Sequence, residues 1–307
     1  MLTDRLADRL TERLPTMARA ALPAVPGVNL LPGIRKTGGA LPERTLERHD
    51  VALDPAHVGR YAAICGFPRK DTLPLPYPHL LAFGLHMEIM TAGDFPFPAI
   101  GTVHLENSIT QHRPIALSEE LQVTAYAEDL RPHAKGQVFD MVTRVHSRAE
   151  LVWEETSTFL RRGNPASSAA PVETPPSVVE PVETRFPDAP ATGTTWQLPG
   201  DLGRRYAAVS GDHNPIHLYG LTAKAFGFPR QIAHGMWSMA RCVGALENRL
   251  PDEVRVDVAF KKPILLPGSV AFGSRRLTES GGGAGYTFSL SNPRSGAPHL
   301  AGTAIPR

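Results

Sequence analysis

The sequence predicts an α+β fold made of two similar halves, each an antiparallel sheet wrapped around one long apolar helix. Two pairs of matching segments carry this prediction. YAAICG, from Tyr61, resembles YAAVSG, from Tyr206, and HRPIAL, from His112, resembles KKPILL, from Lys261. Because both matches occur in the same order at nearly the same separation, they indicate an ancient duplication.

The order of elements within each half supports the same fold. In the second half, short helices are expected over 201–209 and 219–227, and a long helix over 233–250 whose apolar residues recur at helical spacing. Four strand-like runs separated by Gly and Pro follow, over 254–260, 270–275, 286–290 and 300–305. Four similar runs close the first half, over 103–110, 121–127, 138–145 and 151–160. A long apolar helix followed by a strand meander predicts a sheet that covers the helix.

Composition narrows the class of protein. A length of 307 residues favours two domains, each long enough to bury its own core. The formal net charge of +2 gives no field that would attract nucleic acid. The two cysteines, Cys65 and Cys242, form no disulfide framework and are typical of a reducing cytosol. Since no apolar run is long enough to span a bilayer, we expect a cytoplasmic protein without a membrane span.

The chain divides into four predicted segments. Residues 1–45 begin with leucines spaced every four positions among Asp, Arg and Glu, which predicts an amphipathic helix and an extended segment rather than a signal peptide. This helix is expected to pack on the protein or on a partner subunit, with a membrane-surface role as the less favoured alternative. Residues 46–162 form the first half, and 194–307 form the second. Between them, 163–193 is rich in Pro and predicts an exposed linker.

The octapeptide SGDHNPIH, which ends at His217, concentrates polar side chains and admits three interpretations. Asp212, His213, His217 and His234 are residue types that bind zinc. However, Pro215 suits the first turn of a helix and places His213 outside it, so no ligand geometry is specified. We therefore expect no metal.

The second interpretation is a helix start, and the third is a catalytic loop. Asn214 suits an N-cap, Pro215 opens a helix, and Gly211 suits a turn. A cap explains one polar residue, but it does not explain Asp212 and His217 together. A carboxylate and an imidazole with different proton affinities can serve as an acid–base pair.

The segments YAAVSGDHNPIH, AKAFGFPRQIAHGM and FKKPILLPG resemble the MaoC-like, or R-specific, enoyl-thioester hydratases. The resemblance is closest over 196–307. The duplicated layout is similar to that of the double hot-dog 3-hydroxyacyl-thioester dehydratases, in which two hot-dog folds form a pseudo-dimer. The first copy is degenerate, because its shorter segment FPRKDTLPLPYP lacks the acid–base pair. The resemblance thus implies two tandem hot-dog folds with one catalytic half.

The resemblance also implies roles for individual residues. Asp212 and His217 are the acid–base pair, and the N–H of Gly235, at the start of the long helix, stabilises the thioester oxygen. Asn214 and His234 are expected to support this pair. One position departs from the pattern, because Val243 stands where several single-domain members have a serine.

Four cations are candidates for binding the phosphates of coenzyme A or of a phosphopantetheine arm. They are Lys224, Arg230, Lys261 and Lys262. Acid, base and oxyanion donors suffice for the expected chemistry, so no cofactor is required. The expected partners are an acyl-CoA or acyl carrier protein thioester and, for the chain itself, a possible homodimer.

The function implied is a hydro-lyase of fatty-acid metabolism that reversibly dehydrates (3R)-3-hydroxyacyl thioesters to trans-2-enoyl thioesters. Two alternatives stay open. A hot-dog acyl-thioesterase would need an acid on the central helix, where Glu247 stands late in the helix. A non-catalytic acyl-carrier-binding subunit would have lost activity in both copies, although the second copy retains the whole motif.

Overall fold

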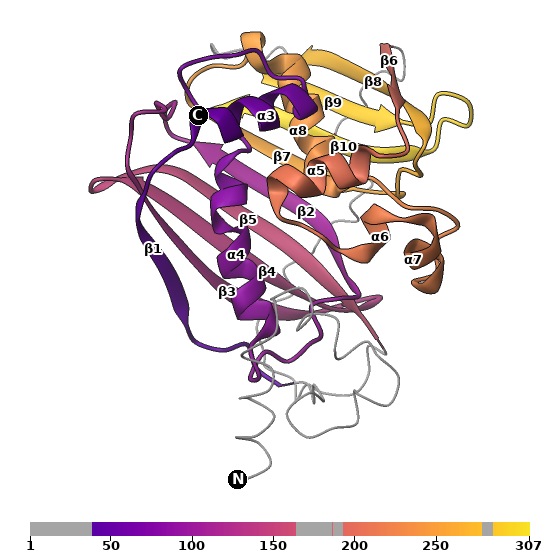
Figure 1. Ribbon diagram of the computed structural model, residues 1–307, viewed down its shortest axis with the longest axis horizontal. Helices are drawn as coiled ribbons and strands as arrows, with labels where there is room; N and C mark the ends of the chain where they lie inside the picture. The colour runs from indigo at the N-terminus through magenta and orange to yellow at the C-terminus, as the bar shows by residue number, and fades with distance from the viewer. Residues whose placement is uncertain (1–38, 164–185, 187–192, 278–284) are drawn as a thin grey trace.

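The strands of the protein form one antiparallel sheet (Figure 1). The computed structural model describes residues 39–163, 186, 193–277 and 285–307. Within them the sheet has ten strands in the order β1-β3-β4-β5-β2-β7-β10-β9-β8-β6. Five strands of the first half stand on one side of the centre, and the five of the second half repeat their arrangement in reverse order. The chain therefore folds as two tandem hot-dog units, which confirms the expected fold class.

The first half contains seven of the elements, and the second half contains the others. The first comprises β1 (Thr45–Val51), α3 (Pro55–Cys65), α4 (Pro78–Thr91), β2 (Thr102–Gln111), β3 (Leu121–His133), β4 (Gly136–Ser147) and β5 (Glu150–Arg162). The second comprises β6 (Thr194–Leu198), α5 (Leu202–Ser210), α6 (Pro215–Leu218), α7 (Gly220–Ala225), α8 (Gly235–Leu246), the 3-10 helix η3 (Glu247–Arg249), β7 (Val254–Phe260), β8 (Gly268–Leu277), β9 (Gly285–Ser291) and β10 (Pro298–Pro306).

The eight predicted strands are all present, whereas the two edge strands were not predicted. β1 reads TLERHDV and is mostly exposed, so its sequence lacks the apolar alternation that identifies a half-buried strand. The long helix is shorter than expected, because α8 ends at Leu246 and the chain tightens into η3.

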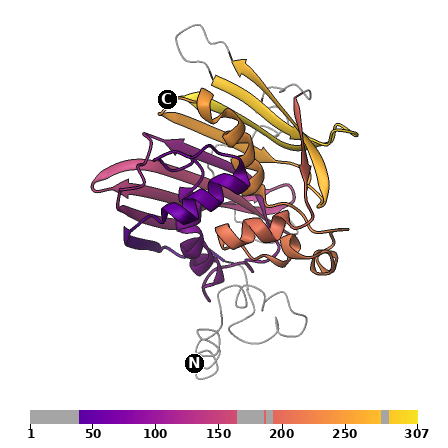
Figure 2. The same ribbon diagram turned by 45° about the horizontal axis from the view of Figure 1, so that its top comes forward.

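The two halves are joined in the middle of the sheet and through their helices (Figure 2). β2 pairs with β7 from Glu106 opposite Ala259 to Gln111 opposite Val254. On the covered face, the indole of Trp237 in α8 donates a hydrogen bond to the Ile64 carbonyl of α3 at 3.0 Å. The halves thus share one sheet and one core.

The duplicated YAA segments have the same local structure. They form the ends of α3 and α5, which stop at Gly66 and Gly211 with φ of 75° and 76°. A left-handed C-cap favours glycine, which explains the final residue of each segment. Tyr61 and Tyr206 meet where the halves join, with their ring centroids 6.3 Å apart.

The short segment that replaces the catalytic loop in the first half is packed onto its sheet. The Leu73 N–H donates to the Ile115 carbonyl at 2.8 Å, and the Trp153 indole donates to the Leu75 carbonyl at 2.8 Å. The side chains of Leu73 and Leu75 are buried. This segment therefore covers the sheet without contributing an acid–base pair.

Two predicted segments fall outside what the structure describes. The N-terminal segment 1–45, with its predicted amphipathic helix, is one except for residues 39–45. The linker is the other except for Gly163, Phe186 and Gly193. Phe186 is buried, although the linker was predicted to be exposed. The domain boundaries stay predictions. No helix in the described part of the chain is both long and apolar enough to cross a membrane.

Close packing of α5 on α6 gives a test of the fold beside the catalytic loop. A Cβ on Gly203 would overlap the backbone carbonyl oxygen of His217, whereas a Cβ on Gly84 in α4 would meet nothing within 4 Å. We expect Gly203→Ala to destabilise the protein by about 1–3 kcal/mol, as overpacking does. The matched control Gly84→Ala should stabilise it by roughly 0.5–1 kcal/mol, because alanine is the better helix former. Thermal unfolding compares the two, and equal melting temperatures would contradict the close packing.

Candidate active site

The octapeptide forms the turn that leads from α5 into α6. Gly211 ends α5 in the left-handed conformation, and the Asn214 side chain accepts a hydrogen bond from the Ile216 N–H at 3.4 Å. Pro215 occupies the first turn of α6. The predicted helix start is thus confirmed, and it places Asp212 in the turn before α6 and His217 within α6.

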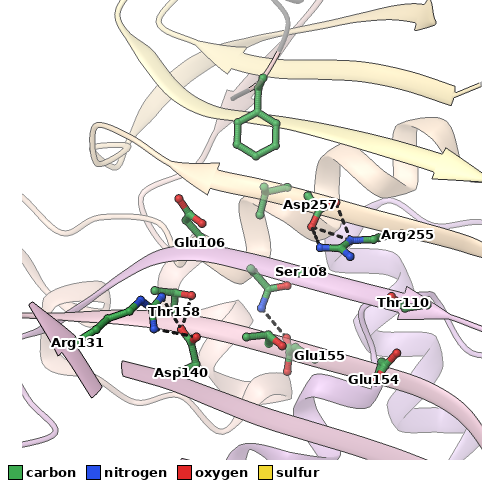
Figure 3. Close-up of a pocket in the computed structure, with 14 residues that line it drawn as sticks. Glu106, Ser108, Thr110, Arg131, Asp140, Glu154, Glu155, Thr158, Arg255 and Asp257 are labelled. Atoms are coloured by element: carbon green, nitrogen blue, oxygen red, sulfur yellow. Dashed lines mark hydrogen bonds and ion pairs between the residues drawn. The ribbon is translucent and has the colours of Figure 1, made fainter. Parts of the chain in front are cut away.

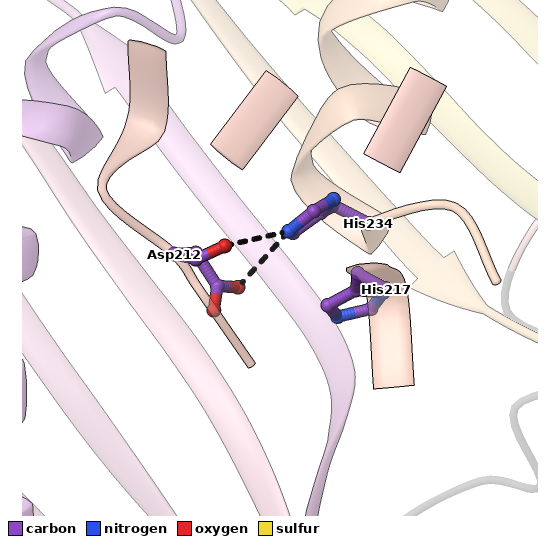
Figure 4. Close-up of side chains that lie close together, drawn as sticks. All are labelled: Asp212, His217 and His234. Carbon is purple, nitrogen blue, oxygen red and sulfur yellow. Dashed lines mark hydrogen bonds and ion pairs between the residues drawn. The ribbon is translucent and has the colours of Figure 1, made fainter. Parts of the chain in front are cut away.

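Asp212, His217 and His234 are brought together by this turn and by the start of α8 (Figure 4). Their carboxylate and imidazole atoms lie within 4.8 Å of one another. The two imidazole rings are stacked with centroids 3.7 Å apart, and both are buried. The side chain of Asp212 is 28% exposed, so this corner of the cluster is open to a small molecule.

Backbone carbonyls fix the tautomers of both histidines. His217 Nδ1 lies 2.9 Å from the Ile232 carbonyl, and His234 Nε2 lies 3.0 Å from the Asp212 carbonyl. A carbonyl only accepts, so each of these nitrogens carries the hydrogen. The neutral His217 ring therefore has its lone pair on Nε2, whereas that of His234 is on Nδ1, a buried atom without a hydrogen-bond partner in the described structure.

The electrostatics of the cluster favour one carboxylate beside two neutral imidazoles. Burial lowers the pKa of His217 below its usual value, although Asp212 opposes the shift. Burial, with the stacked His217 ring, lowers the pKa of His234 to about 3. For Asp212, burial acts to raise the pKa, but His234, His217 and the Asn214 N–H outweigh it and lower the pKa. The Asn214 N–H lies 3.0 Å from Asp212 Oδ1.

Gly235 begins α8 directly after His234. Its N–H makes no hydrogen bond with any residue that the structure describes. A free N–H at a helix N-terminus is a favourable donor to an anion, because the helix dipole adds to it. A Cβ here would lie 3.2 Å from Cε1 of Phe260, so glycine also suits the packing.

The same cluster is the one group of potential metal ligands found among the described residues. Its hydrogen bonds do not suit a metal, because His234 Nε2, which faces Asp212, carries a hydrogen and has no lone pair to offer. Zinc usually takes at least three protein ligands, and this arrangement leaves Asp212 and His217. The geometry fits acid–base chemistry better, and a metal-free site stays a prediction.

Sequence reasoning missed a buried ion pair that the first half places near the cluster. His79, at the start of α4, lies 2.9 Å from Glu155 of β5, and Asn107 of β2 donates to the same carboxylate at 2.7 Å. Burial acts against both charges, but Glu155 outweighs it and raises the pKa of His79, while His79 lowers that of Glu155. Each group therefore favours the charged form of the other. The one signal in the sequence is that β5 carries an acidic residue, Glu155, on the side that faces the core.

Aromatic rings of the first half form the adjoining wall. Phe83 of α4 would lie 3.7 Å from a Cβ on Gly211. The His104 ring packs on Phe260, the ring next to Gly235, with centroids 4.8 Å apart. The candidate site thus lies where the two halves meet, although its polar cluster belongs to the second half alone.

The remaining predicted residues lie outside this cluster. Lys224 in α7 and Arg230 in the following loop are exposed, and Lys261 and Lys262 directly follow β7. Val243 is fully buried in α8 and contributes to the core. The nearby hydroxyl is that of Ser238, which donates to the His234 carbonyl at 3.2 Å.

A separate pocket of about 350 Å³ opens on the opposite face of the sheet (Figure 3). Ser108 and Thr156 line it, and so do their neighbours Asn107 and Glu155, which are hydrogen-bonded to each other at 2.7 Å. Its charged residues include two ion pairs, Arg131 with Asp140 and Arg255 with Asp257. Buried Phe186 also lines it. This pocket shares no side chain with the catalytic cluster.

Comparison with known proteins shows the family. A family model described as MaoC like domain matches residues 172–275. The protein named 3-hydroxyacyl-thioester dehydratase X, from Mycobacterium tuberculosis, is 38% identical over 286 residues, which are 93% of this chain and 94% of that protein. The chain belongs to the MaoC-like dehydratase family. 

Solved structures of MaoC-like dehydratases share the architecture. The crystal structure of HtdX from Mycobacterium tuberculosis superposes with a TM-score of 0.70 at 38% identity, covering 85% of this chain and 99% of that chain. A MaoC-like dehydratase from Phytophthora capsici has a TM-score of 0.65 at 21% identity, covering 87% and 96% of the two chains. The second likeness supports the fold alone.

We expect the purified protein to contain no stoichiometric zinc, because the proton on His234 Nε2 removes one ligand from the cluster. Elemental analysis checks the metal content. Thermal unfolding with and without a chelator gives an independent readout, and the two melting temperatures should agree. One tightly bound ion per chain, with a lower melting temperature after chelation, would establish a metal site instead.

Proposed function

We propose that this protein is a hydro-lyase of fatty-acid metabolism that reversibly dehydrates (3R)-3-hydroxyacyl thioesters to trans-2-enoyl thioesters. The observation that supports this most is the convergence of a carboxylate, a neutral imidazole with a free Nε2 and an unpaired helix N–H. These belong to Asp212, His217 and Gly235. The name of the Mycobacterium tuberculosis relative, 3-hydroxyacyl-thioester dehydratase X, supports the same reaction.

The reaction needs one proton to leave C2 and one to reach the hydroxyl at C3. A basic atom of the Asp212–His217 pair takes the C2 proton, and the electron pair moves onto the thioester oxygen as an enolate. The Gly235 N–H donates a hydrogen bond to that oxygen, with the dipole of α8 adding to it. The enolate then reforms the carbonyl, the C2–C3 double bond forms, and the C3 hydroxyl takes a proton from the pair and leaves as water. The pair returns to its starting protonation state.

Two neighbours hold the pair in place. Asn214 caps α6 with its side chain and donates its backbone N–H to Asp212 Oδ1 at 3.0 Å. His234 stacks on His217 and donates to the Asp212 carbonyl. We propose that both are supporting residues, since each contacts a member of the pair.

The thioester carrier is the less defined part of the substrate. We propose that Lys224, Arg230, Lys261 and Lys262 contribute to binding the phosphates of coenzyme A or of a phosphopantetheine arm. Their positions on the chain around the cluster support this. Acid, base and hydrogen-bond donors supply the chemistry, so the proposed reaction requires no cofactor, and a homodimer of the chain stays a prediction.

The thioesterase alternative finds no support in the position of Glu247. This acid follows α8, whose twelve residues separate it from Gly235 by about 18 Å. Its carboxylate is paired with Lys70 at 2.9 Å. Whether the chain is instead a non-catalytic acyl-carrier-binding subunit is decided by measuring its activity. The prediction that the first half is inactive is tested in the same way.

We expect Asp212→Asn and His217→Gln each to lower the hydration rate of an enoyl-CoA ester by about 10²–10⁴, because each removes a positioned proton-transfer group. Loss of the conjugated enoyl absorbance measures the rate. The matched control is His213→Gln, since His213 is exposed in the same turn. Circular dichroism and the melting temperature report folding, and near-normal activity in either well-folded variant would refute the assignment.

The acid limb of the pH profile is the second test. His217 must be neutral to accept a proton, and its pKa is lowered from 6.5, so kcat/KM should be unaffected by pH near 7 and fall only below 6.5. Asp212, whose pKa is lowered from 3.8, stays ionised through this range. Since kcat/KM reports the free enzyme, it is measured from pH 5 to 8. An acid limb centred above 6.5 would contradict a buried, neutral His217.

A further inference from the structure

Helix α7 follows α6, which carries His217 (Figure 1). The residues of α7 and its flanks expose large apolar side chains. Leu221 is 83% exposed, Tyr219 56% and Phe226 39%, and these are the exposed large hydrophobic residues of the described structure. An isolated exposed leucine is ordinary, but three large apolar residues within eight positions indicate a contact surface.

Several exposed cations lie on the chain segments around these side chains. Arg204, Arg205, Lys224 and Arg230 are exposed and form no ion pair with a described residue. Over the stretch 202–246, Asp212 is the one acidic residue, and it belongs to the catalytic cluster. The surface therefore presents apolar groups among unpaired cations.

Contacts place Arg204 and the loop that carries Arg230 beside α7. Arg204 donates to the Leu218 carbonyl at 2.9 Å, and its guanidinium lies 5.1 Å from the centre of the Tyr219 ring. The loop that carries Arg230 is held beside α7, because a Cβ on Gly220 would lie 3.2 Å from Oε1 of Gln231. We call the three apolar residues together with Arg204, Lys224 and Arg230 the α7 patch.

The α7 patch borders the cluster directly. His217 lies in α6, and Tyr219 follows it by two residues, between α6 and α7. The α5 backbone at Gly203 lies against the His217 carbonyl. A partner bound on the α7 patch would therefore stand beside the acid–base pair.

We propose that the α7 patch docks a small acidic carrier protein that bears the acyl thioester on a phosphopantetheine arm. This inference rests on the proposed dehydratase function and specifies its partner. An acidic partner complements the unpaired cations, which would also speed its encounter with the site. The protruding Leu221 and Tyr219 fit a protein surface better than a nucleotide, because nucleotides are bound in concave pockets. Tyrosine and arginine are also the residue types enriched in binding hot spots.

The test compares one acyl chain on two carriers. We expect Leu221→Glu and Arg204→Glu each to lower kcat/KM for the carrier-protein thioester by about tenfold or more, the loss typical of an interface hot spot. With the coenzyme A thioester, both variants should stay within about twofold of the unaltered protein. Lys224 and Arg230 are left unchanged, since they are proposed to contact the phosphates that both substrates carry. The matched control is Arg294→Glu, which reverses an exposed charge in the turn between β9 and β10.

The outcomes separate this inference from the function on which it rests. Inactivity of the unaltered protein toward both thioesters would overturn the dehydratase function, and the docking with it. Activity with coenzyme A thioesters, together with equal losses on both carriers or no loss on either, would overturn the docking alone. A change of oligomeric state in the variants, measured by size-exclusion chromatography with light scattering, would show that a second copy of the chain occupies the α7 patch and would likewise overturn it.

Discussion

The candidate site depends on a reciprocal pair of hydrogen bonds between α6 and the segment that leads into α8. The Ile232 N–H donates to the Ile216 carbonyl at 3.1 Å, and His217 Nδ1 donates to the Ile232 carbonyl at 2.9 Å. The first bond holds α6 against the entry to the long helix. The second fixes the tautomer that leaves His217 Nε2 free. Together they bring a base, a carboxylate and a helix N-terminus to one place from separate elements.

The two halves contribute different chemistry to the same junction. The second half supplies Asp212, His217 and Gly235, whereas the first supplies aromatic rings and the ion pair of His79 with Glu155. A buried ion pair is costly to break, because the remaining charge loses its partner in an apolar environment. The first half thus has a buried polar centre of its own, whereas the Asp212–His217 turn belongs to the second half alone.

The sequence predicted the elements whose signal is local. Eight strands followed from apolar runs between turn residues, and the turn through Gly211 and Asn214 followed from capping chemistry. β1 and β6 were missed because an edge strand is stabilised by pairing with its neighbour, and that pairing is not encoded in its own pattern. The ion pair was missed for a related reason, since its partners are 76 residues apart and meet only after the sheet has formed. The tautomers of His217 and His234 were not predicted either. They depend on backbone carbonyl groups, which every residue carries and which no sequence pattern marks.

The pairing of β2 with β7 places the junction of the halves inside a single chain. In a symmetric dimer of identical subunits, any change at the interface occurs twice, so one copy cannot lose its catalytic loop while the other keeps it. A duplicated chain is free of this restriction, and each half can change by itself. Its junction also forms without a concentration-dependent encounter, since both faces are tethered. The difference between the two halves is thus a specialisation that a symmetric assembly could not have reached.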